Sequence, residues 1–359
     1  MRLVPVINVS NIISSMCYSL FRAEPYLICP YKCVYCYRRW YLNEFVQNSS
    51  PLRGNINAII NIVKCIVKRR LKPYPARLST LTEPFSTLES MYKLSLYFLK
   101  EAFKLKCPII VNTKSSLPLE KIWLNILENL SHYSLIVFQI SLSTLKDDIA
   151  RKIEPHAPTP KNRVTTAAKL SEKGVPVILR LSPLIPKMVL NELDEIVDTA
   201  VHIGVEHVVV EALGLQPNEF KRLYSILKLN AEETESYSLV GEYRLVKPSR
   251  KVLFPIYSEL QRKLVKNGIG FAICKEGFFS LHTVPDCCGF YLLRNHAKRL
   301  TLYEYYKYAL EKGPIDAAMI NNVHNELCRK ENIVCIDDLR RYPKTLSKQF
   351  RYHEKGFLR

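Results

Sequence analysis

Between residues 55 and 215, short apolar runs alternate with amphipathic segments, and this alternation constrains the fold more than any other feature of the chain. The runs are continuously apolar, which is typical of strands that are buried on both faces of a parallel sheet. Strands are predicted at 76–80, 108–111, 134–142, 175–181 and 205–210. Helices are predicted at 56–70, 88–103, 119–130, 160–173 and 190–203. Repeated βα units form either a doubly wound sheet or an α/β barrel, and periodicity alone does not choose between them.

The alternation ends near residue 216. Beyond it lie helical patterns at 220–229 and 255–266, a cysteine-containing stretch at 273–293 and a tyrosine-rich helical tail. We therefore divide the chain into a core, residues 1–215, and a mainly helical C-terminal extension, residues 216–359.

The hydrophobic pattern of the sequence indicates where the protein is located. No apolar run reaches the roughly 18 residues that a membrane helix needs, so we expect a cytoplasmic protein without a membrane partner. Residues 1–13 are apolar but lack a small-residue cleavage site, and they predict a buried strand or helix rather than a signal peptide.

The net charge of +19 makes DNA or RNA a natural partner, although lysine-rich surfaces also occur on proteins without that role. The odd count of 11 cysteines argues against a disulfide framework.

Three cysteines, Cys29, Cys33 and Cys36, are spaced C-x3-C-x2-C. Three thiolates can hold three irons of a 4Fe-4S cubane and leave the fourth with the open positions that a catalytic metal needs. An open iron can bind S-adenosylmethionine, whose reductive cleavage gives a 5′-deoxyadenosyl radical that abstracts hydrogen from a substrate. Zinc is the alternative, and it would need a fourth ligand from elsewhere. The ring of Tyr35 could lie against the adenine, although plain packing is the ordinary role of such a residue.

Several further motifs resemble the radical S-adenosylmethionine (radical SAM) superfamily, and within it the spore photoproduct lyase-related, DNA repair photolyase-like group. The resemblance covers about residues 20–215. Besides the cysteines, its motifs are Pro25-Tyr26, Leu78–Phe85, Thr113–Ser115, Gln139–Thr144, Glu154–Pro158, Arg180–Pro186 and Val209–Glu211. It implies a partial (β/α)6 barrel with the cluster in the loop after the first strand. It also implies a 4Fe-4S cluster, S-adenosylmethionine and a ferredoxin- or flavodoxin-like electron donor.

The resemblance assigns cofactor contacts to five residues. Thr82 and Glu83 would lie near the methionine amino group, and Lys114, Ser141 and Arg180 near the carboxylate and ribose. Each falls at the end of a predicted strand, where a barrel places its ligand groups. A polar cap on the strand is the alternative role for each.

The resemblance also suggests roles for His156 and Glu211, and the sequence differs from the family at one position. His156 is either a proton donor or a loop residue held between two prolines, and we favour the loop role. Glu211 could contact the cofactor or the substrate. Spore photoproduct lyase returns a hydrogen atom to its product from a cysteine near the second-strand motif, but residues 78–83 contain no cysteine. This difference argues against thymine-dimer repair by the same route.

A second group of cysteines, Cys274, Cys287 and Cys288, lies in the extension, with His282 between them and Cys328 and Cys335 further on. These residues could bind an auxiliary cluster or zinc, or supply a hydrogen atom, or be ordinary buried thiols. Neighbouring side chains point apart, which makes it difficult for adjacent cysteines to bind one metal.

The sequence therefore predicts an enzyme that cleaves S-adenosylmethionine reductively, with nucleic acid as the expected substrate and a lyase or repair reaction as one outcome. The alternatives are a zinc-stabilised nucleic-acid-binding protein without catalysis, and a radical SAM enzyme that acts on a peptide or small metabolite.

Overall fold

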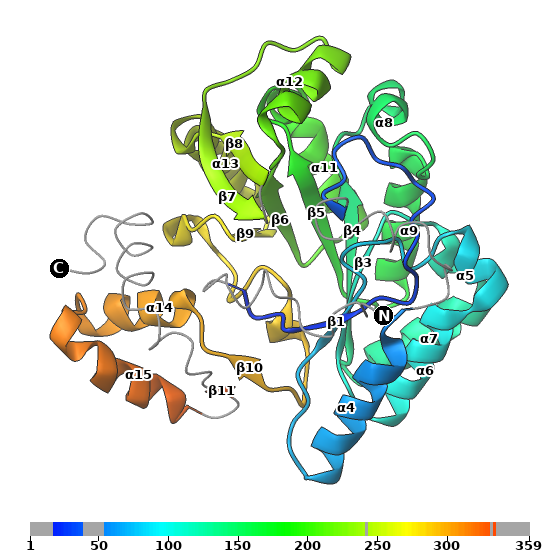
Figure 1. Cartoon of the computed structure of the whole chain (residues 1–359), viewed down its shortest axis with the longest axis vertical. Coiled ribbons are helices and arrows are strands. Elements are labelled where there is room, and N and C mark those ends of the chain that lie inside the picture. Colours follow the sequence, from blue (N-terminus) through cyan, green and yellow to red (C-terminus); the bar gives the residue numbers. More distant parts are fainter. Residues whose placement is uncertain (1–16, 39–53, 241–242, 331–332, 335–359) are drawn as a thin grey trace.

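The computed structural model describes residues 17–38, 54–240, 243–330 and 333–334. At its centre is a seven-stranded sheet whose neighbouring strands are all parallel (Figure 1). In order across the sheet, the strands are β1 (Phe21–Ala23), β2 (Ala76–Leu78), β3 (Ile109–Thr113), β4 (Ile136–Leu142), β5 (Val177–Leu184), β6 (His207–Ala212) and β9 (Gly270–Ile273). Among the described strands, β1 and β9 each pair on one side only, so the barrel is partial and open. The predicted parallel α/β fold is confirmed.

The helices of the core connect successive strands, and all of them except α5 and α8 pack apolar residues against the outer face of the sheet (Figure 1). They are α4 (Ile56–Lys68), α5 (Thr87–Tyr92), α6 (Leu94–Lys104), α7 (Lys121–His132), α8 (Asp147–Ile153), α9 (Pro160–Glu172), α10 (Pro186–Asn191) and α11 (Leu193–Ile203). Strand residues alternate between the two faces. Phe138 and Leu179 pack with the helices in the main core, whereas Val137 and Ile178 pack in a separate cluster on the inner face.

Local chemistry explains the helix boundaries that the sequence predicts well. Thr159 caps α9, because its side chain accepts a hydrogen bond from the amide of Asn162, and Pro160 occupies the first helical position. Gly174 and Gly204 follow α9 and α11 with φ of 75° and 71°, in the left-handed region that ends a helix.

The helix predicted at 88–103 is two helices, α5 and α6, separated by Lys93 with φ of 53°. The cause is Glu89, a fully buried carboxylate. It accepts hydrogen bonds from the amides of Ser95 (2.8 Å) and Leu96 (2.9 Å), the indole of Trp123 (2.8 Å) and the hydroxyl of Tyr26. The carboxylate therefore caps α6 from within the preceding helix, which requires the chain to turn between them.

The segment after residue 216 contributes more to the core than the sequence predicts. Strand β9 adds a seventh strand beside β6, one more than the resemblance implies. Along the chain, four elements separate β6 from β9. They are α12 (Pro217–Ile226), the antiparallel pair β7 (Thr234–Val240) and β8 (Tyr243–Pro248), and α13 (Arg250–Lys266). Helix α13 begins five residues before Pro255, which lies inside it, and not at Pro255 as predicted.

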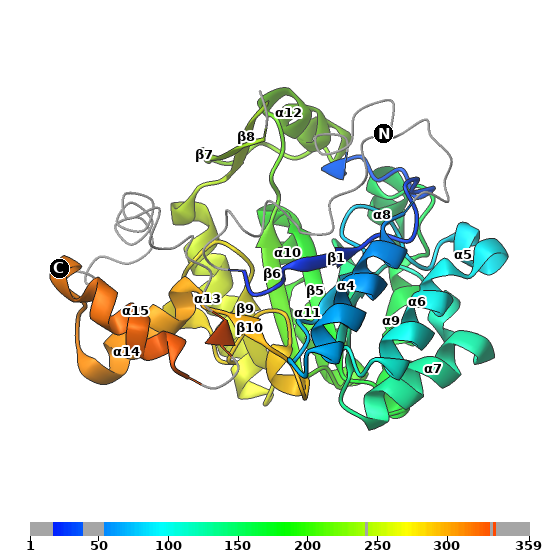
Figure 2. The same cartoon turned by 60° about the horizontal axis from the view of Figure 1, so that its bottom comes forward.

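The remaining elements form a smaller apolar cluster. Helices α14 (Leu302–Lys312) and α15 (Ile320–Cys328) pack there with the segment around β10 (Lys298–Arg299) and β11 (Ile333–Val334). Figure 2 shows them on the opposite side of the sheet from α6 and α7. The element predicted at 1–13 lies outside the described residues. No described helix is both long and apolar enough to span a bilayer.

Glu89→Ala should lower the free energy of unfolding by about 3 kcal/mol, because four buried donors would lose their acceptor. Urea denaturation of the anaerobic protein measures this. The matched control is Glu101→Ala on α6, which removes surface ion pairs with Lys104 and Lys64 and should change stability little. Equal losses in the two variants would contradict the capping role.

Candidate functional site

The cysteine motif lies in the loop that follows β1, at the carboxyl end of that strand. Backbone hydrogen bonds hold the cysteine motif in place. The amide of Val34 donates to the carbonyl of Ile153 at the end of α8 (2.8 Å), and the amide of Cys36 donates to the carbonyl of Cys33 (3.1 Å). Cys29, Cys33 and Cys36 are free thiols of intermediate exposure, so a group that arrives from solvent can reach them.

The three thiols lie close enough to influence one another's ionisation. Burial raises the pKa of Cys29 to about 12, and the nearby Glu83 and Cys36 add to the rise. Burial also raises the pKa of Cys33, against the opposing charge of Lys114. Each thiol must lose its proton to bind a metal, so the positive charge of bound iron would offset these effects. Three neighbouring thiols on one loop fit a cubane, in which each thiolate binds a different iron.

Glu83 lies between the cysteine loop and β3. This buried carboxylate accepts hydrogen bonds from the amides of Lys114 (2.9 Å) and Phe85 (3.1 Å) and from the hydroxyl of Thr113. Burial raises its pKa, while these hydrogen bonds lower it. Glu83 therefore ties the loop after β2 to the end of β3, beside Cys29.

Thr82 belongs to a different network. Its hydroxyl lies 3.1 Å from both the carboxylate of Glu24 and the carbonyl of Tyr26, and its one hydrogen has these two acceptors within reach. Glu24 is buried and also accepts hydrogen bonds from Ser79 and from the amide of Thr80. The carboxylate of Glu24 thus orders the loop after β2, and the hydroxyl of Thr82 is already engaged in that role.

Lys114, Ser141 and Tyr35, which were predicted separately from the sequence, meet in one polar network. The ammonium of Lys114 donates to the hydroxyl of Ser141 (2.6 Å), forms an ion pair with Glu154 (3.6 Å), and lies 5.9 Å from the ring centre of Tyr35. The hydroxyl of Tyr35 donates to Glu154 and lies 3.0 Å from the hydroxyl of Ser143. The network connects the cysteine loop to the carboxyl ends of β3 and β4.

Glu154 is the centre of this network, and sequence reasoning did not assign it a role. Burial raises its pKa, but the charges of Lys114 and Arg163 outweigh burial and lower that pKa to about 2. Arg163 on α9 is equally buried and forms an ion pair with Glu154. The motif at 154–158 was noted in the sequence for its histidine. His156, however, is exposed in the loop between α8 and α9.

Comparison with known proteins identifies the domain that carries this loop. Residues 24–200 match the family described as the Radical SAM superfamily. These residues form a radical SAM domain.

Two relatives match part of this chain. An uncharacterized protein of Acidianus two-tailed virus is 28% identical over 176 residues, which cover 46% of this chain and 56% of that protein. An uncharacterized protein of Methanocaldococcus jannaschii is 24% identical over 164 residues, which cover 46% of this chain and 60% of that protein. The chain therefore spans less than two thirds of the length of either relative.

Solved structures of spore photoproduct lyase have a similar fold. A cysteine variant of that enzyme aligns with a TM-score of 0.56 at 11% identity, over 76% of this chain and 79% of the other. Another variant, solved with bound AdoMet and a dinucleoside spore photoproduct, aligns with a TM-score of 0.53 at 13% identity, over 71% and 76%. These likenesses support the fold that the sequence resemblance predicts.

Arg180, the last of the predicted cofactor contacts, lies on the inner face of β5, in register with Ser141 on β4. It forms an ion pair with Glu211 on β6, and its guanidinium also lies 3.6 Å from the sulfur of Cys274. It therefore lies beside the network of Lys114, and its role as a cofactor contact remains a prediction.

The inner face of the radical SAM domain retains polar atoms that have no hydrogen-bond partner within the described residues. They are Oδ1 of Asn112, Oε1 of Gln139 and Nη1 of Arg180. Asn112 and Gln139 are register partners on β3 and β4, so two of these atoms belong to neighbouring strands. Buried polar atoms usually find a partner. This arrangement fits a polar cofactor such as S-adenosylmethionine, which offers both donors and acceptors.

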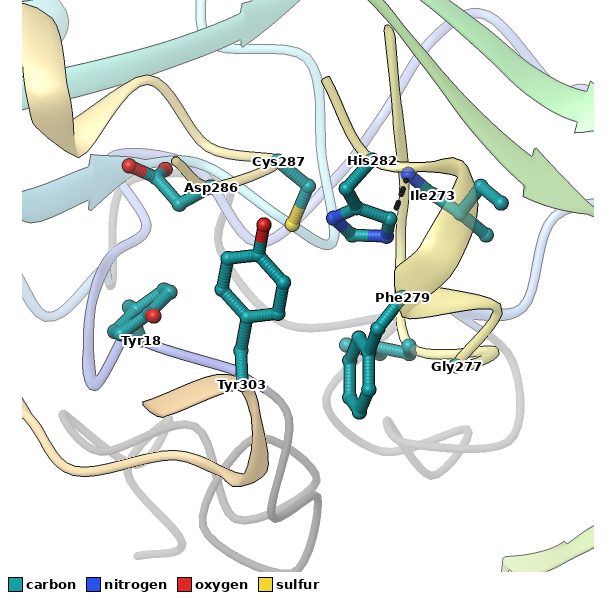
Figure 3. Close-up of a pocket in the computed structure, with 9 residues that line it drawn as sticks. Tyr18, Ile273, Gly277, Phe279, His282, Asp286, Cys287 and Tyr303 are labelled. Carbon is teal, nitrogen blue, oxygen red and sulfur yellow. Dashed lines mark hydrogen bonds between the residues drawn. The ribbon is translucent and has the colours of Figure 1, made fainter. Parts of the chain in front are cut away.

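The cysteines of the extension lie together, as their sequence clustering suggested. Cys274, Cys287 and Cys288 are buried against the inner face of the sheet. His282 uses its Nε2 to accept the amide of Ile273 (3.3 Å) and lies at the edge of a small pocket beside Cys287 (Figure 3). Cys328 is disulfide-bonded at the end of α15, and Cys335 lies outside the described residues.

Glu154→Gln should destabilise the protein by about 3 kcal/mol at pH 7, because Arg163 would be left buried without its anion. The folded pKa of Glu154 is about 2, below its ordinary value of 4.5. Its contribution to stability is therefore complete above pH 4.5 and is lost as the pH falls towards 2. Denaturation of wild type and variant from pH 7 to 3 should show their difference shrinking below pH 4.5.

The control for Glu154 is Glu195→Gln, which removes an exposed carboxylate that pairs with Lys146. This variant should remain close to wild type across the same pH range. A Glu154→Gln variant as stable as wild type at pH 7 would refute the expected contribution of this buried ion pair to the free energy of unfolding.

Proposed function

We propose that the chain uses Cys29, Cys33 and Cys36 to hold a 4Fe-4S cluster and that it cleaves S-adenosylmethionine reductively. The observation that carries the proposal is the loop after β1, where three partly exposed thiols of a radical SAM domain lie together without a fourth cysteine in the loop. When bound, such a cluster supplies the electron that breaks the sulfonium C–S bond and yields methionine and a 5′-deoxyadenosyl radical.

The side chains around the loop have the chemistry to bind and orient the cofactor. The ammonium of Lys114 is a partner for the methionine carboxylate, and the hydroxyl of Ser141 lies beside it (2.6 Å). Glu83, a buried acceptor next to the cysteine loop, suits the methionine amino group. Glu154 and Arg163 hold Lys114 and Tyr35 in position, because both charges of that ion pair are buried.

The first test is formation of 5′-deoxyadenosine by dithionite-reduced protein, followed by liquid chromatography. Wild type should form it, and Cys33→Ala should lose at least 100-fold in rate, because two thiolates do not retain the cluster. Cys65→Ala, which removes an exposed cysteine on α4, is the matched control and should keep wild-type activity. Equal product from wild type and Cys33→Ala would refute the proposed function.

We also propose nucleic acid as the substrate class. The support is the net charge of +19, with 52 Lys plus Arg against 33 Asp plus Glu. Peptides and small metabolites are the competing substrates, since radical chemistry at this site does not itself select one.

Binding to labelled DNA and RNA separates these substrate classes. If the protein covers several phosphates, affinity should fall about 10³-fold between 50 and 200 mM salt, as counterions are released. Fluorescence anisotropy at a series of salt concentrations measures this, with a neutral peptide of similar size as the control ligand. Affinity for nucleic acid that is weak and independent of salt would exclude it as the substrate.

A further inference from the structure

Four cysteines from two distant parts of the chain lie in one buried region inside the partial barrel. Cys17 precedes β1, Cys274 follows β9, and Cys287 and Cys288 lie in the loop after β9. Their exposed fractions are 3%, 5%, 7% and 1%. Cys17 was not expected here from the sequence, because it is isolated there from the other three.

The four thiols are neighbours in series. The sulfurs of Cys287 and Cys288 are 3.8 Å apart. Cys17 lies close enough to Cys288, and Cys274 close enough to Cys287, for each to shift the pKa of its neighbour. Ordinary buried cysteines are isolated small apolar residues, as Cys107 is in the outer core. Four neighbouring thiols are instead the donor set of a thiolate-ligated metal centre.

Two buried arginines face this group of sulfurs. The guanidinium of Arg77 donates to the sulfur of Cys288 (2.9 Å), and that of Arg180 donates to Cys274 (3.6 Å). Arg180 also pairs with Glu211, but the other polar partner of Arg77 is the neutral hydroxyl of Ser19. A buried cation needs a compensating anion, and a thiolate at Cys288 would supply it for Arg77. A centre with four thiolates carries the net negative charge that these arginines would balance.

Hydrogen bonds to Asp286 and close packing of Gly289 fix the turn that contains Cys287 and Cys288. Asp286 accepts the amides of Cys288 (2.9 Å), Phe290 (2.9 Å) and Tyr291 (3.1 Å). Gly289, with φ of 82°, lies so close to the sheet that a Cβ there would be 2.7 Å from Ile178. The chain therefore holds this pair of thiols firmly against the inner face.

A small pocket reaches the group of thiols from one side. Tyr18, Cys287, His282 and Tyr303 line it, and in Figure 3 the sulfur of Cys287 faces the hydroxyl of Tyr303 and the ring of His282. Because Nε2 of His282 accepts the amide of Ile273, we leave His282 out of the proposed ligand set.

We propose that Cys17, Cys274, Cys287 and Cys288 ligate a second metal centre, an iron–sulfur cluster or a zinc ion. Within the described residues, no three His, Cys, Asp or Glu side chains yet stand at the distances that a single bound ion imposes. Binding therefore requires the thiols to lose their protons and to turn about their Cα–Cβ bonds toward the metal. This centre is independent of the one proposed at Cys29, Cys33 and Cys36.

The test uses the full chain with Cys29, Cys33 and Cys36 all changed to alanine, purified anaerobically and analysed for iron, sulfide and zinc. This triple variant should retain about four iron and four sulfide, or about one zinc, per chain. Four iron identify a cluster and one zinc identifies a structural zinc site, and both results support the proposal. A folded triple variant without metal would overturn it.

The ligand assignment is tested by adding Cys17→Ser to the triple variant, which should remove more than half of the retained metal. Cys107→Ser is the matched control, because it changes an equally buried thiol in the outer core and should leave the metal in place. Equal metal in both variants would exclude Cys17 as a ligand.

Wild-type stoichiometry keeps the test decisive even if a variant does not fold. About eight iron, or about four iron plus one zinc, is expected per chain, and four iron alone would overturn the second centre. Formation of 5′-deoxyadenosine by wild type in that case would leave the proposed function intact.

Discussion

The inner face of an open parallel sheet has to be filled, and the rest of this structure follows from how the chain fills it. Helices bury the outer face, but a sheet whose edges do not meet leaves its inner face to loops and termini. Here the loop after β9 packs its cysteines and Phe290 against Val137, Ile178 and Val209. Asn112, Gln139 and Arg180 keep unpartnered polar atoms on the same face. The interior therefore has an apolar region made by the chain and polar positions for a ligand.

Buried carboxylates order the loops around those polar positions. Glu24 holds the loop after β2, Glu83 ties that loop to β3, and Glu154 joins the cysteine loop to α9. In each case backbone amides or cations surround a carboxylate that has almost no contact with water. Because an unpaired buried charge is very unfavourable, each loop is confined to the conformation that supplies the partners.

The sequence predicts those parts of the fold that depend on local pattern. The strand predicted at 134–142 is β4, and the glycine-terminated helices α9 and α11 end where their caps require. Strands β1 and β9 were not predicted, because they are short runs that lie outside the alternating pattern at 55–215, which identifies the equally short β2. The split between α5 and α6 was also missed, since it depends on the tertiary partners of Glu89.

The same limit applies to the functional residues. Lys114 and Ser141 end predicted strands, so their position in a barrel already suggested a site. Glu154 and Arg163 gave no such signal, because their importance comes from burial as an ion pair between a loop and a helix. Cys17 is isolated in the sequence. It lies beside the other three cysteines only in the folded chain, where the segments next to the edge strands β1 and β9 enter the same interior.

A metal held by the four buried cysteines would connect the two edges of the sheet, which a metal held by Cys29, Cys33 and Cys36 would not do. Cys17 is connected to the edge strand β1 and Cys274 to the opposite edge strand β9. A metal bound to both would crosslink the edges of the open barrel and reduce the entropy of the unfolded chain, as other long-range crosslinks do. Cys29, Cys33 and Cys36 belong to one loop, where a metal closes only a short segment. A closed centre that joins the sheet and an open one that meets a cofactor are therefore consistent with the different burial of the two sets.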